Sequence, residues 1–567
     1  MAANYVAVSV SDANQASVPG YTISIVDPSS LLKTSLLPVG SETSGTGKTY
    51  QIFDIVNLKK LGITVAHPQY AGRSLEITLD SNTGNWSTNA RSVYFGIYSP
   101  STITSSIVPT VEIPLLRVRR SQTRRLAVPG PTGTAEGVLD DPGAIWLNPS
   151  GQVVGLTDGS ISGYPVVVDP TLSKDETKSD WGRFNSASKG VDPSTATGGT
   201  WFDWLEYGDP GTTKWLMAIW VIGRAGAKPN PNTTDVVVLY SPNTAFSLYA
   251  PKDVYPYKRK FILNKLTNNL VLVQPYPNLA YRYLAPGGTA GKDGKDFGFA
   301  YQAMAAERSL VLIMPIQFFG FWGPVLAQDG LARMIQEVLL YVGDNTVNAT
   351  QPFSVFGQYQ RPRLGRIALA GYSAGMSDVR LLLKTSTYQA LASTYAALAS
   401  KATGADRANY SDMAQRLRAL PESMWASPAD LFTKNCREVY SIDGFFQGDN
   451  KSFQNEMGDW FTRTDDAMLR IYATDGRFKE SEVITGTKLD DVFRGVSPQV
   501  MGKPPLASKE FHRSDARASF AWFTEAFMTF KGVDFMPDAT NPDIDAHHTI
   551  PRVVLSHAIS LSRFAKP

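Results

Sequence analysis

Residues 366–383 join a buried-strand pattern to a helical pattern through a turn rich in glycine. Residues 367–370 form a short apolar run, and residues 379–383 supply the apolar side of a helix. Between them lies Gly371-Tyr-Ser-Ala-Gly375, in which the glycines allow close approach of the backbone. The pentapeptide alone is frequent by chance, so its place between strand and helix is what makes it informative. The sequence predicts a nucleophile elbow, a tight strand-to-helix turn that holds the Ser373 hydroxyl out of a sheet.

The composition describes a globular chain without a marked charge. Its 567 residues are too many for one ordinary core, so two or three domains are expected. Because the net charge is only +3, nothing indicates nucleic-acid binding. One basic cluster, residues 117–125, is interpreted as a solvated loop or a domain boundary. Cys436 is the only cysteine and is interpreted as a buried structural thiol. No residue set has metal-ligand spacing, and no cofactor is predicted.

The first residues of the sequence lack a basic start and a long apolar stretch. No classical signal peptide is therefore expected. Nor does the sequence contain an uncharged apolar run long enough to form a transmembrane segment. We expect a soluble protein, either cytoplasmic or exported without a classical signal peptide.

Three regions follow from the patterning. Residues 1–125 carry short strand patterns separated by turn residues, which predicts an all-β, sandwich-like domain. Such a domain is a candidate for recognising a glycan or a partner protein. Residues 126–212 read as an irregular Gly/Pro-rich connecting region. From residue 213 to 567, continuous apolar strands alternate with helical patterns, which predicts a doubly wound, mostly parallel α/β domain with an insertion or cap around 477–545.

The strands expected in the α/β domain share continuous apolar runs. They lie at 215–222, 236–240, 270–273, 310–316, 367–370 and 439–442. The helical patterns lie at 297–306, 330–342, 376–384 and, with a break, 391–420. Ligands of such sheets bind at the carboxyl ends of the strands, which is where Ser373 falls.

A serine hydroxyl needs a positioned base to become a nucleophile, and imidazole is the usual one. Of the five histidines, His547 and His548 lie in a loop before a helix that begins at Pro551. The imidazole in turn needs a carboxylate to fix its tautomer. Asp443 and Asp475 each end a strand pattern after Ser373 and each precede a glycine. By this reasoning both aspartates and both histidines remain candidates.

With these residues the chain resembles the α/β-hydrolase superfamily over roughly residues 210–567. The order Ser, Asp, His is the order of that family. The resemblance implies Asp475 in preference to Asp443, because the acid usually follows the second strand after the nucleophile. His548-Thr-Ile-Pro551 is similar to a His-Thr-x-Pro form found in some esterases, which favours His548 over His547.

The resemblance also implies an oxyanion hole. One donor would be the backbone N–H of Ala374, the residue after the nucleophile. The His-Gly signature of the second donor loop is missing from the sequence. The candidate loops, 241–244 and 274–278, offer Asn243, Tyr276 and Asn278 as donors.

These features together predict a serine hydrolase that cleaves carboxylic esters through a Ser-His-Asp catalytic triad and an acyl-enzyme intermediate. The substrate would be a small-molecule or polymeric ester. Two alternatives stay open at this point. One is a catalytically inactive member of the fold that acts as a binding or structural protein, and the other is a peptidase or amidase that uses the same triad.

Overall fold

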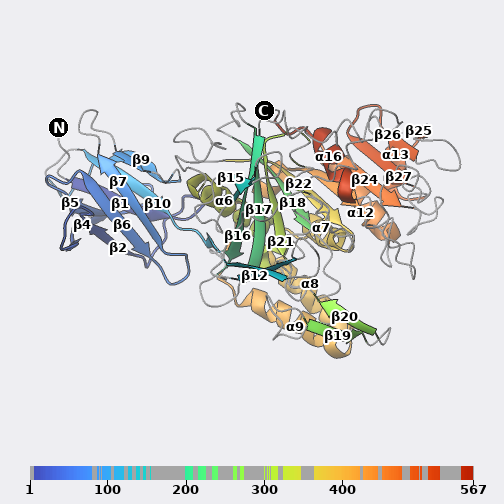
Figure 1. Cartoon of the computed structure of the whole chain (residues 1–567), viewed down its shortest axis with the longest axis horizontal. Coiled ribbons are helices and arrows are strands. Elements are labelled where there is room, and N and C mark those ends of the chain that lie inside the picture. The colour runs from blue at the N-terminus through green and yellow to red at the C-terminus, as the bar shows by residue number, and fades with distance from the viewer. Residues whose placement is uncertain are drawn as a thin grey trace.

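A computed structural model gives the structure of the chain (Figure 1). It describes residues 5–79, 86–88, 90, 92–103, 107–120, 125–129, 136–140, 145–147, 153–154, 198–208, 215–224, 233–240, 260–264, 269–273, 299, 303, 306, 308–316, 323–345, 363–421, 425–444, 450–474, 486–496, 499–500, 509–523 and 551–565. Two structural regions stand out. Residues 5–114 form a β region, and most of the rest of the described chain belongs to a large sheet and the helices that pack on it.

The N-terminal β region, residues 5–114, contains two five-stranded sheets. The first has the order β4-β5-β1-β10-β9, with bounds Pro38–Thr43, Thr49–Asp54, Tyr5–Ser11, Val108–Pro114 and Tyr94–Tyr98. The second has the order β3-β2-β6-β7-β8, with bounds Ser35–Leu36, Thr22–Val26, Lys60–Ala66, Arg73–Leu79 and Trp86–Thr88.

One hydrophobic core holds these two sheets together. In β6, Leu61, Ile63 and Val65 are buried and alternate with residues that are more exposed, as expected for a strand with one covered face. Val8 and Phe53 of the first sheet belong to the same buried cluster as these β6 residues. The all-β pattern predicted for the start of the chain therefore corresponds to a β-rich region with its own core.

The second region is built on a sheet of thirteen strands. Its order is β15-β14-β16-β17-β21-β18-β22-β23-β24-β27-β26-β25, and β11 (Val118–Arg120) pairs with β16. The bounds in that order are Val153–Val154, Ile145–Leu147, Gly198–Tyr207, Trp215–Arg224, Leu310–Ile316, Thr234–Tyr240, Leu364–Tyr372, Cys436–Ile442, Met468–Thr474, Ala518–Phe523, Lys509–His512 and Gln499–Val500. The six strands from β21 to β27 are mutually parallel, while β17 and β26 run antiparallel to their neighbours.

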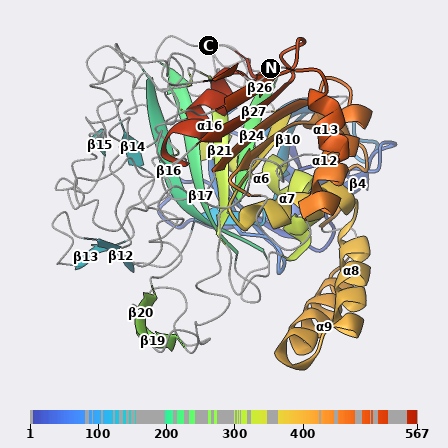
Figure 2. The ribbon, with the colours of Figure 1, turned by 90° about the vertical axis from the view of Figure 1, so that its right-hand side faces the viewer.

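The helices between these strands cover both faces of the sheet. They are η4 (Gly323–Leu326), α6 (Gln328–Asn345), α7 (Gly375–Lys384), α8 (Tyr388–Lys401), α9 (Gly404–Arg418), α11 (Leu431–Asn435), α12 (Asn450–Arg463), α13 (Lys488–Phe493) and α16 (Pro551–Ser560). Ile471 of β24 packs in the same core as α6, α7 and α12. Its neighbour Tyr472 points to the other face, where His557 of α16 contacts it. Figure 2 shows α16 and α12 on opposite sides of β24.

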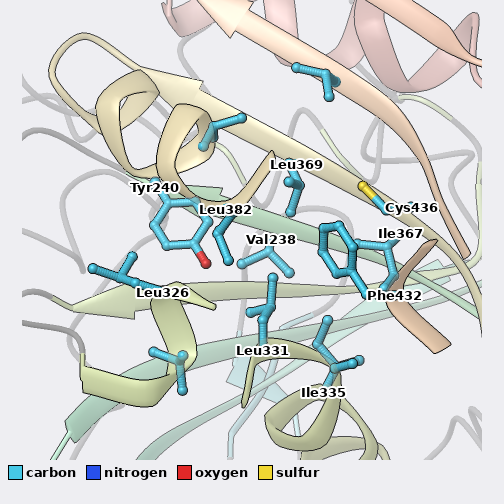
Figure 3. Packing of buried hydrophobic residues seen from close by; sticks show 14 of the residues in the cluster. Val238, Tyr240, Leu326, Leu331, Ile335, Ile367, Leu369, Leu382, Phe432 and Cys436 are labelled. Atoms are coloured by element: carbon cyan, nitrogen blue, oxygen red, sulfur yellow. The ribbon is translucent and has the colours of Figure 1, made fainter. Parts of the chain in front are cut away.

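The core of this region forms where α6 and α7 pack on the central strands (Figure 3). Leu331 of α6 and Leu382 of α7 lie in one buried cluster with Val238 and Leu369 of the sheet. Cys436, at the start of β23, is buried beside them, and burial raises the pKa of its thiol. The interpretation of Cys436 as a buried structural thiol is confirmed.

The structure shows how two of the predicted segments fold. The predicted strand at 270–273 is part of β20 (Asn269–Val273), which pairs antiparallel with β19 (Lys260–Asn264) in a separate hairpin. The helical pattern 391–420 is broken, because α8 ends at Lys401 and α9 begins at Gly404. The region boundaries at 125 and 212 stay predictions. β12 (Arg125–Pro129) begins at the first boundary and forms a hairpin with β13 (Glu136–Asp140), and β16 pairs across the second boundary with β17 over ten residues.

A buried ionic joint connects the N-terminal β region to helix α6. Arg117 is fully buried and pairs with Glu337 of α6 at 3.4 Å. Its guanidinium lies between the rings of Tyr70 and Trp425, 4.7 and 4.9 Å from their centroids. Arg117 is therefore not part of a solvated loop; it lies between β10 and β11, which agrees with the alternative interpretation as a domain boundary. The reason is long-range: the carboxylate and aromatic partners of Arg117 come from distant parts of the sequence.

Further polar contacts extend the joint along α6. Arg333 bonds Asp12 of the β region at 3.0 Å and Glu337 at 3.1 Å. At the end of the helix, Asp344 accepts hydrogen bonds from the Ser92 backbone at 2.7 Å and from Arg73 at 2.5 Å. The β region is thus attached to α6 from Arg333 to Asp344.

The chain after α16 is held against the amino-terminal edge of the parallel strands. Glu438 of β23 accepts a hydrogen bond from the Arg563 backbone at 3.0 Å, and Asp235 of β18 accepts one from Ala565 at 2.8 Å. Burial raises the pKa values of both carboxyl groups. These bonds fix the end of α16, and therefore the helix that follows residues 547 and 548. Among the described residues, no helix is long and apolar enough to cross a membrane.

Replacing Glu337 by alanine is expected to lower the free energy of unfolding by about 3–5 kcal/mol, because it leaves the buried charge of Arg117 without its carboxylate. Urea denaturation of the full chain measures the change. Lys434→Ala is the matched control, since Lys434 pairs with Asp430 on the surface, where such a pair contributes roughly 0.5 kcal/mol or less. Equal effects of the two substitutions would contradict a structural role for the joint.

Asp329, at the start of α6, is buried, and burial raises the pKa of its carboxyl to about 7. Its carboxylate accepts a hydrogen bond from the Gly330 N–H at 2.7 Å. The unfolded chain loses this proton near pH 4, while the folded chain keeps it until about pH 7. The stability due to the neutral acid is therefore complete below pH 4 and is lost as the pH rises from 4 to 7.

Asp329→Asn is accordingly expected to stabilise the chain at pH 8 by roughly 1–3 kcal/mol, because the amide keeps an acceptor and carries no charge. The gain should shrink towards zero at pH 4. Urea unfolding of both proteins between pH 4 and 8 measures it. A difference that does not change with pH would show that burial of the charge is not the cause.

Candidate active site

Ser373 occupies the turn between β22 and α7, as the sequence predicted. It has a φ of +54°, in the left-handed region that side chains other than glycine seldom adopt. Its backbone N–H donates to Ile442 of β23 at 2.9 Å, and its carbonyl accepts from Met376 at 3.1 Å. A strained serine held by the neighbouring strand and the first turn of a helix is the geometry of a nucleophile elbow.

Met376 explains why the two strands beside this turn each carry a glycine where they meet helix α7. A Cβ built on Gly371 would lie 2.9 Å from the Met376 Cα. A Cβ on Gly444, just after β23, would lie 2.6 Å from the Met376 Cβ and 3.3 Å from the Ser373 carbonyl oxygen. The first turn of α7 therefore packs directly on the backbone of two strands, and no side chain fits between them.

The topology of the sheet places Ser373 where such sheets bind ligands. The chain leaves β18 for β21 on one side and leaves β22 for β23 on the other. The carboxyl ends of β18 and β22 thus form a topological switch point, where a crevice opens in doubly wound sheets. Tyr240, the last residue of β18, pairs with Gly371 there. Burial raises the pKa of the Tyr240 phenol well above its usual value, so the phenol is neutral at physiological pH.

Asp443 lies on the strand next to the elbow, at the carboxyl end of β23. It is fully buried and has a φ of +46°. Its backbone N–H donates to Tyr472 at 2.8 Å. Its carboxylate accepts from the N–H and the hydroxyl of Thr474, at 3.1 and 3.2 Å. Asp443 therefore binds the last residue of β24, and Asp475 is the next residue in the chain.

Ala374, the predicted oxyanion donor, begins helix α7. It has φ −59° and ψ −17° and is the residue just before the first helical position. N–H groups in the first turn of a helix lack intrahelical acceptors, so they can donate to an anion. The oxyanion role that the family resemblance implies for Ala374 stays a prediction.

Several predicted residues lie outside the described part of the chain. They are Asp475, His547 and His548 of the triad, and Asn243, Tyr276 and Asn278 of the second oxyanion donor loop. The structure therefore brings together Ser373, Ala374 and Asp443, and these other assignments stay predictions. Among the described residues, no cluster of His, Cys, Asp and Glu could hold a metal ion.

Two contacts near the site were not found from the sequence. Thr474 donates twice to Asp443, although nothing in its neighbourhood marks it as functional. His557 is buried in α16 with its Nδ1 2.7 Å from the Tyr472 hydroxyl. This contact fixes α16 on β24. The only signal in the sequence was the place of His557 within a helical apolar pattern.

Comparison with known proteins does not show which family the chain belongs to. No protein-family model matches the chain, and no curated protein does. Among solved structures, a carboxylesterase of Geobacillus stearothermophilus is 12% identical over 50% of this chain and 56% of its own, with a TM-score of 0.15. A prolyl endopeptidase is 9% identical over 76% of this chain and 61% of its own, with a TM-score of 0.20. The chain thus spans less than two thirds of either, and its function has to be argued from the geometry of the site.

Gly444→Ala is expected to destabilise the folded chain by roughly 1–3 kcal/mol and to weaken any reaction at Ser373, because the new methyl group would displace the first turn of α7. Gly45→Ala is the matched control, since a Cβ at that position meets no atom within 4 Å. Thermal unfolding measures the first effect, and labelling of Ser373 by a serine-directed reagent measures the second. Unchanged labelling in Gly444→Ala would contradict the role given to this packing.

Proposed function

We propose that the chain is a serine hydrolase of the α/β-hydrolase fold, with Ser373 as its nucleophile. The observation that carries this proposal is the positive φ of Ser373 at the carboxyl end of a central parallel strand, directly before helix α7. Strain of this kind persists where the surrounding structure enforces it, and it occurs characteristically at functional sites. The topological switch point beside Ser373 supports the same conclusion, because a substrate would reach the hydroxyl there.

The proposed reaction follows the chemistry of the serine triad. The Ser373 hydroxyl attacks the ester carbonyl carbon while His548 takes its proton. The Ala374 N–H stabilises the resulting oxyanion. His548 then returns the proton to the leaving alcohol, and an acyl-serine remains. Water, activated by the same imidazole, hydrolyses the acyl-serine and restores the hydroxyl.

We assign Asp475 as the acid that orients His548 and Asp443 as the residue that positions Asp475. Both carboxylate oxygens of Asp443 accept hydrogen bonds from Thr474. These bonds fix the backbone immediately before Asp475. Asp443 remains the alternate acid, since it also lies at the carboxyl end of the strand next to Ser373.

Ester hydrolysis is preferred because of the similarity of His548-Thr-Ile-Pro551 to a form found in esterases. A peptidase or amidase would use the same residues. Matched ester and amide substrates with the same acyl group separate the two activities, because only the bond to the leaving group differs between them.

A fluorophosphonate reagent is expected to modify Ser373 in the folded chain, as read by mass spectrometry of its peptides. Ser373→Ala should abolish labelling and lower ester hydrolysis by roughly 10³-fold or more, because the acyl-enzyme can no longer form. Ser393→Ala, at an exposed serine of α8, is the matched control and should change neither. Absence of labelling in folded protein would favour the inactive alternative, a binding or structural protein.

Substitution of the candidate partners completes this experiment. Asp475→Asn and His548→Gln are expected to lower the turnover rate by about 10⁴-fold, as loss of a triad partner does. His547→Gln should have little effect. Asp443→Asn should lower the free energy of unfolding, because it weakens the bonds to Thr474. Its effect on the turnover rate should be smaller than that of Asp475→Asn. A larger loss of turnover in Asp443→Asn than in Asp475→Asn would assign the acid to Asp443 instead.

A further inference from the structure

Exposed aliphatic side chains gather at one end of the N-terminal β region. The described residues include ten large hydrophobic side chains that are exposed, and seven of them lie at this end. We call these seven the distal tip. They are Leu31, Leu32, Leu37, Val39, Val56, Ile97 and Ile107. Leu31 and Leu32 are 102% and 86% exposed, so their side chains project beyond their neighbours.

The strand register shows that these residues share one end although they come from five segments. Val26, the last residue of β2, pairs with Ser35 and with Gly62 near the start of β6. The loop between Val26 and Ser35 carries Leu31 and Leu32. Phe53 near the end of β5 pairs with Pro38, which lies between Leu37 and Val39.

The remaining members of the distal tip follow from the same register. Val56 is in the turn from β5 to β6. Ile107 directly precedes β10, whose second residue, Pro109, pairs with Ile97. Because β10 runs parallel to β1 and β5 runs antiparallel to it, the start of β10 and the end of β5 lie at the same end of the sheet.

The opposite end of the β region is the one attached to α6. Asp12 follows the end of β1, Arg73 begins β7, and Arg117 follows β10. These three residues contact Arg333, Asp344 and Glu337 of α6, respectively. The distal tip therefore points away from the joint, and in Figure 1 the β region extends from α6 to one side of the molecule. Exposed apolar side chains gathered at the end of a projecting region mark a candidate interaction site.

The residue types of the distal tip favour a lipid surface over a protein. The cores of protein interfaces are enriched in Trp, Tyr, Met and Arg, whereas Leu and Val are under-represented among their energetic centres. The distal tip contains only Leu, Val and Ile. Projecting aliphatic side chains of this kind can enter the boundary between headgroups and acyl chains, where their burial is favourable.

Two lysines beside the distal tip can reach phospholipid headgroups. Lys33 and Lys59 are exposed, and Lys33 directly follows Leu32. Two carboxylates lie at the same end and accept hydrogen bonds in local turns: the partly exposed Asp27 accepts from the Ser29 N–H at 2.9 Å, and the exposed Asp54 accepts from the Val56 N–H at 3.1 Å. Lysine side chains bury their carbon stems against apolar surface while the ammonium groups reach phosphate oxygens.

We propose that the distal tip inserts into the surface of an anionic phospholipid bilayer and so attaches the chain to membranes peripherally. Leu31 and Leu32 would enter the headgroup boundary first, and Lys33 and Lys59 would bind lipid phosphates. This attachment is independent of the reaction proposed for Ser373.

Flotation of the full chain with vesicles tests the proposal. Vesicles of phosphatidylcholine and phosphatidylglycerol in a 7:3 ratio are compared with phosphatidylcholine alone. The chain is expected to float with the mixed vesicles. The double variant Leu31→Asp, Leu32→Asp should bind them roughly tenfold or more weakly, because it loses two buried leucines and gains two negative charges. Leu398→Asp is the matched control, since it changes an exposed leucine of α8 and should float like the original chain.

A second variant tests the lysines. Lys33→Glu with Lys59→Glu should weaken binding to the mixed vesicles several-fold and abolish its dependence on salt concentration. Thermal unfolding checks that both double variants fold, which is expected because all four side chains are exposed. The proposal is overturned if the chain fails to float, or if the leucine variant floats equally well. It is also overturned if light scattering shows a dimer that the leucine variant dissociates while vesicles bind neither protein.

Discussion

The contact of Met376 with two strands is the constraint on which the candidate site depends. The first turn of α7 reaches the sheet only because positions 371 and 444 carry no side chain. That close approach packs the helix start against the strand ends, beside Ser373 with its left-handed backbone conformation. Such a conformation costs of order 1–3 kcal/mol, and the hydrogen bond from Ser373 to Ile442 together with the buried packing of Met376 offsets it. The turn is therefore held in place by its own packing and hydrogen bonds.

How much of this could be predicted from the sequence depends on how far apart the interacting residues lie. The tight turn at Ser373 was predictable, because a strand, a turn with two glycines and a helix follow one another between residues 364 and 384. Asp443 was predictable as a candidate for the same reason, since an apolar run ends directly before it. The parallel sheet followed from continuous apolar runs, whereas the hairpin that contains 270–273 did not, because an apolar run does not specify its pairing partner.

Contacts between distant segments could not be predicted from the sequence. Gly444 touches the elbow through Met376, and no local pattern links them. Nothing in the sequence distinguishes Thr474 from other strand residues, and its importance follows from the hydrogen bond that its hydroxyl donates to Asp443. Arg117 looked like part of a solvated basic cluster because its partner, Glu337, lies 220 positions further on. In each case the chemistry of one residue is defined by a partner that only the folded chain brings near.

The joint at Arg117 also determines how the two regions act together. Burying this arginine with a carboxylate and two aromatic rings carries a large desolvation cost, so its main effect is on orientation. The contacts hold only when the end of the β region is aligned along α6, and α6 packs in the same core as β22 and α7. The distal tip is in this way placed in a fixed direction relative to Ser373. A membrane bound by the distal tip would therefore lie in a fixed direction from Ser373. If the two regions moved freely relative to each other, that direction would no longer be fixed.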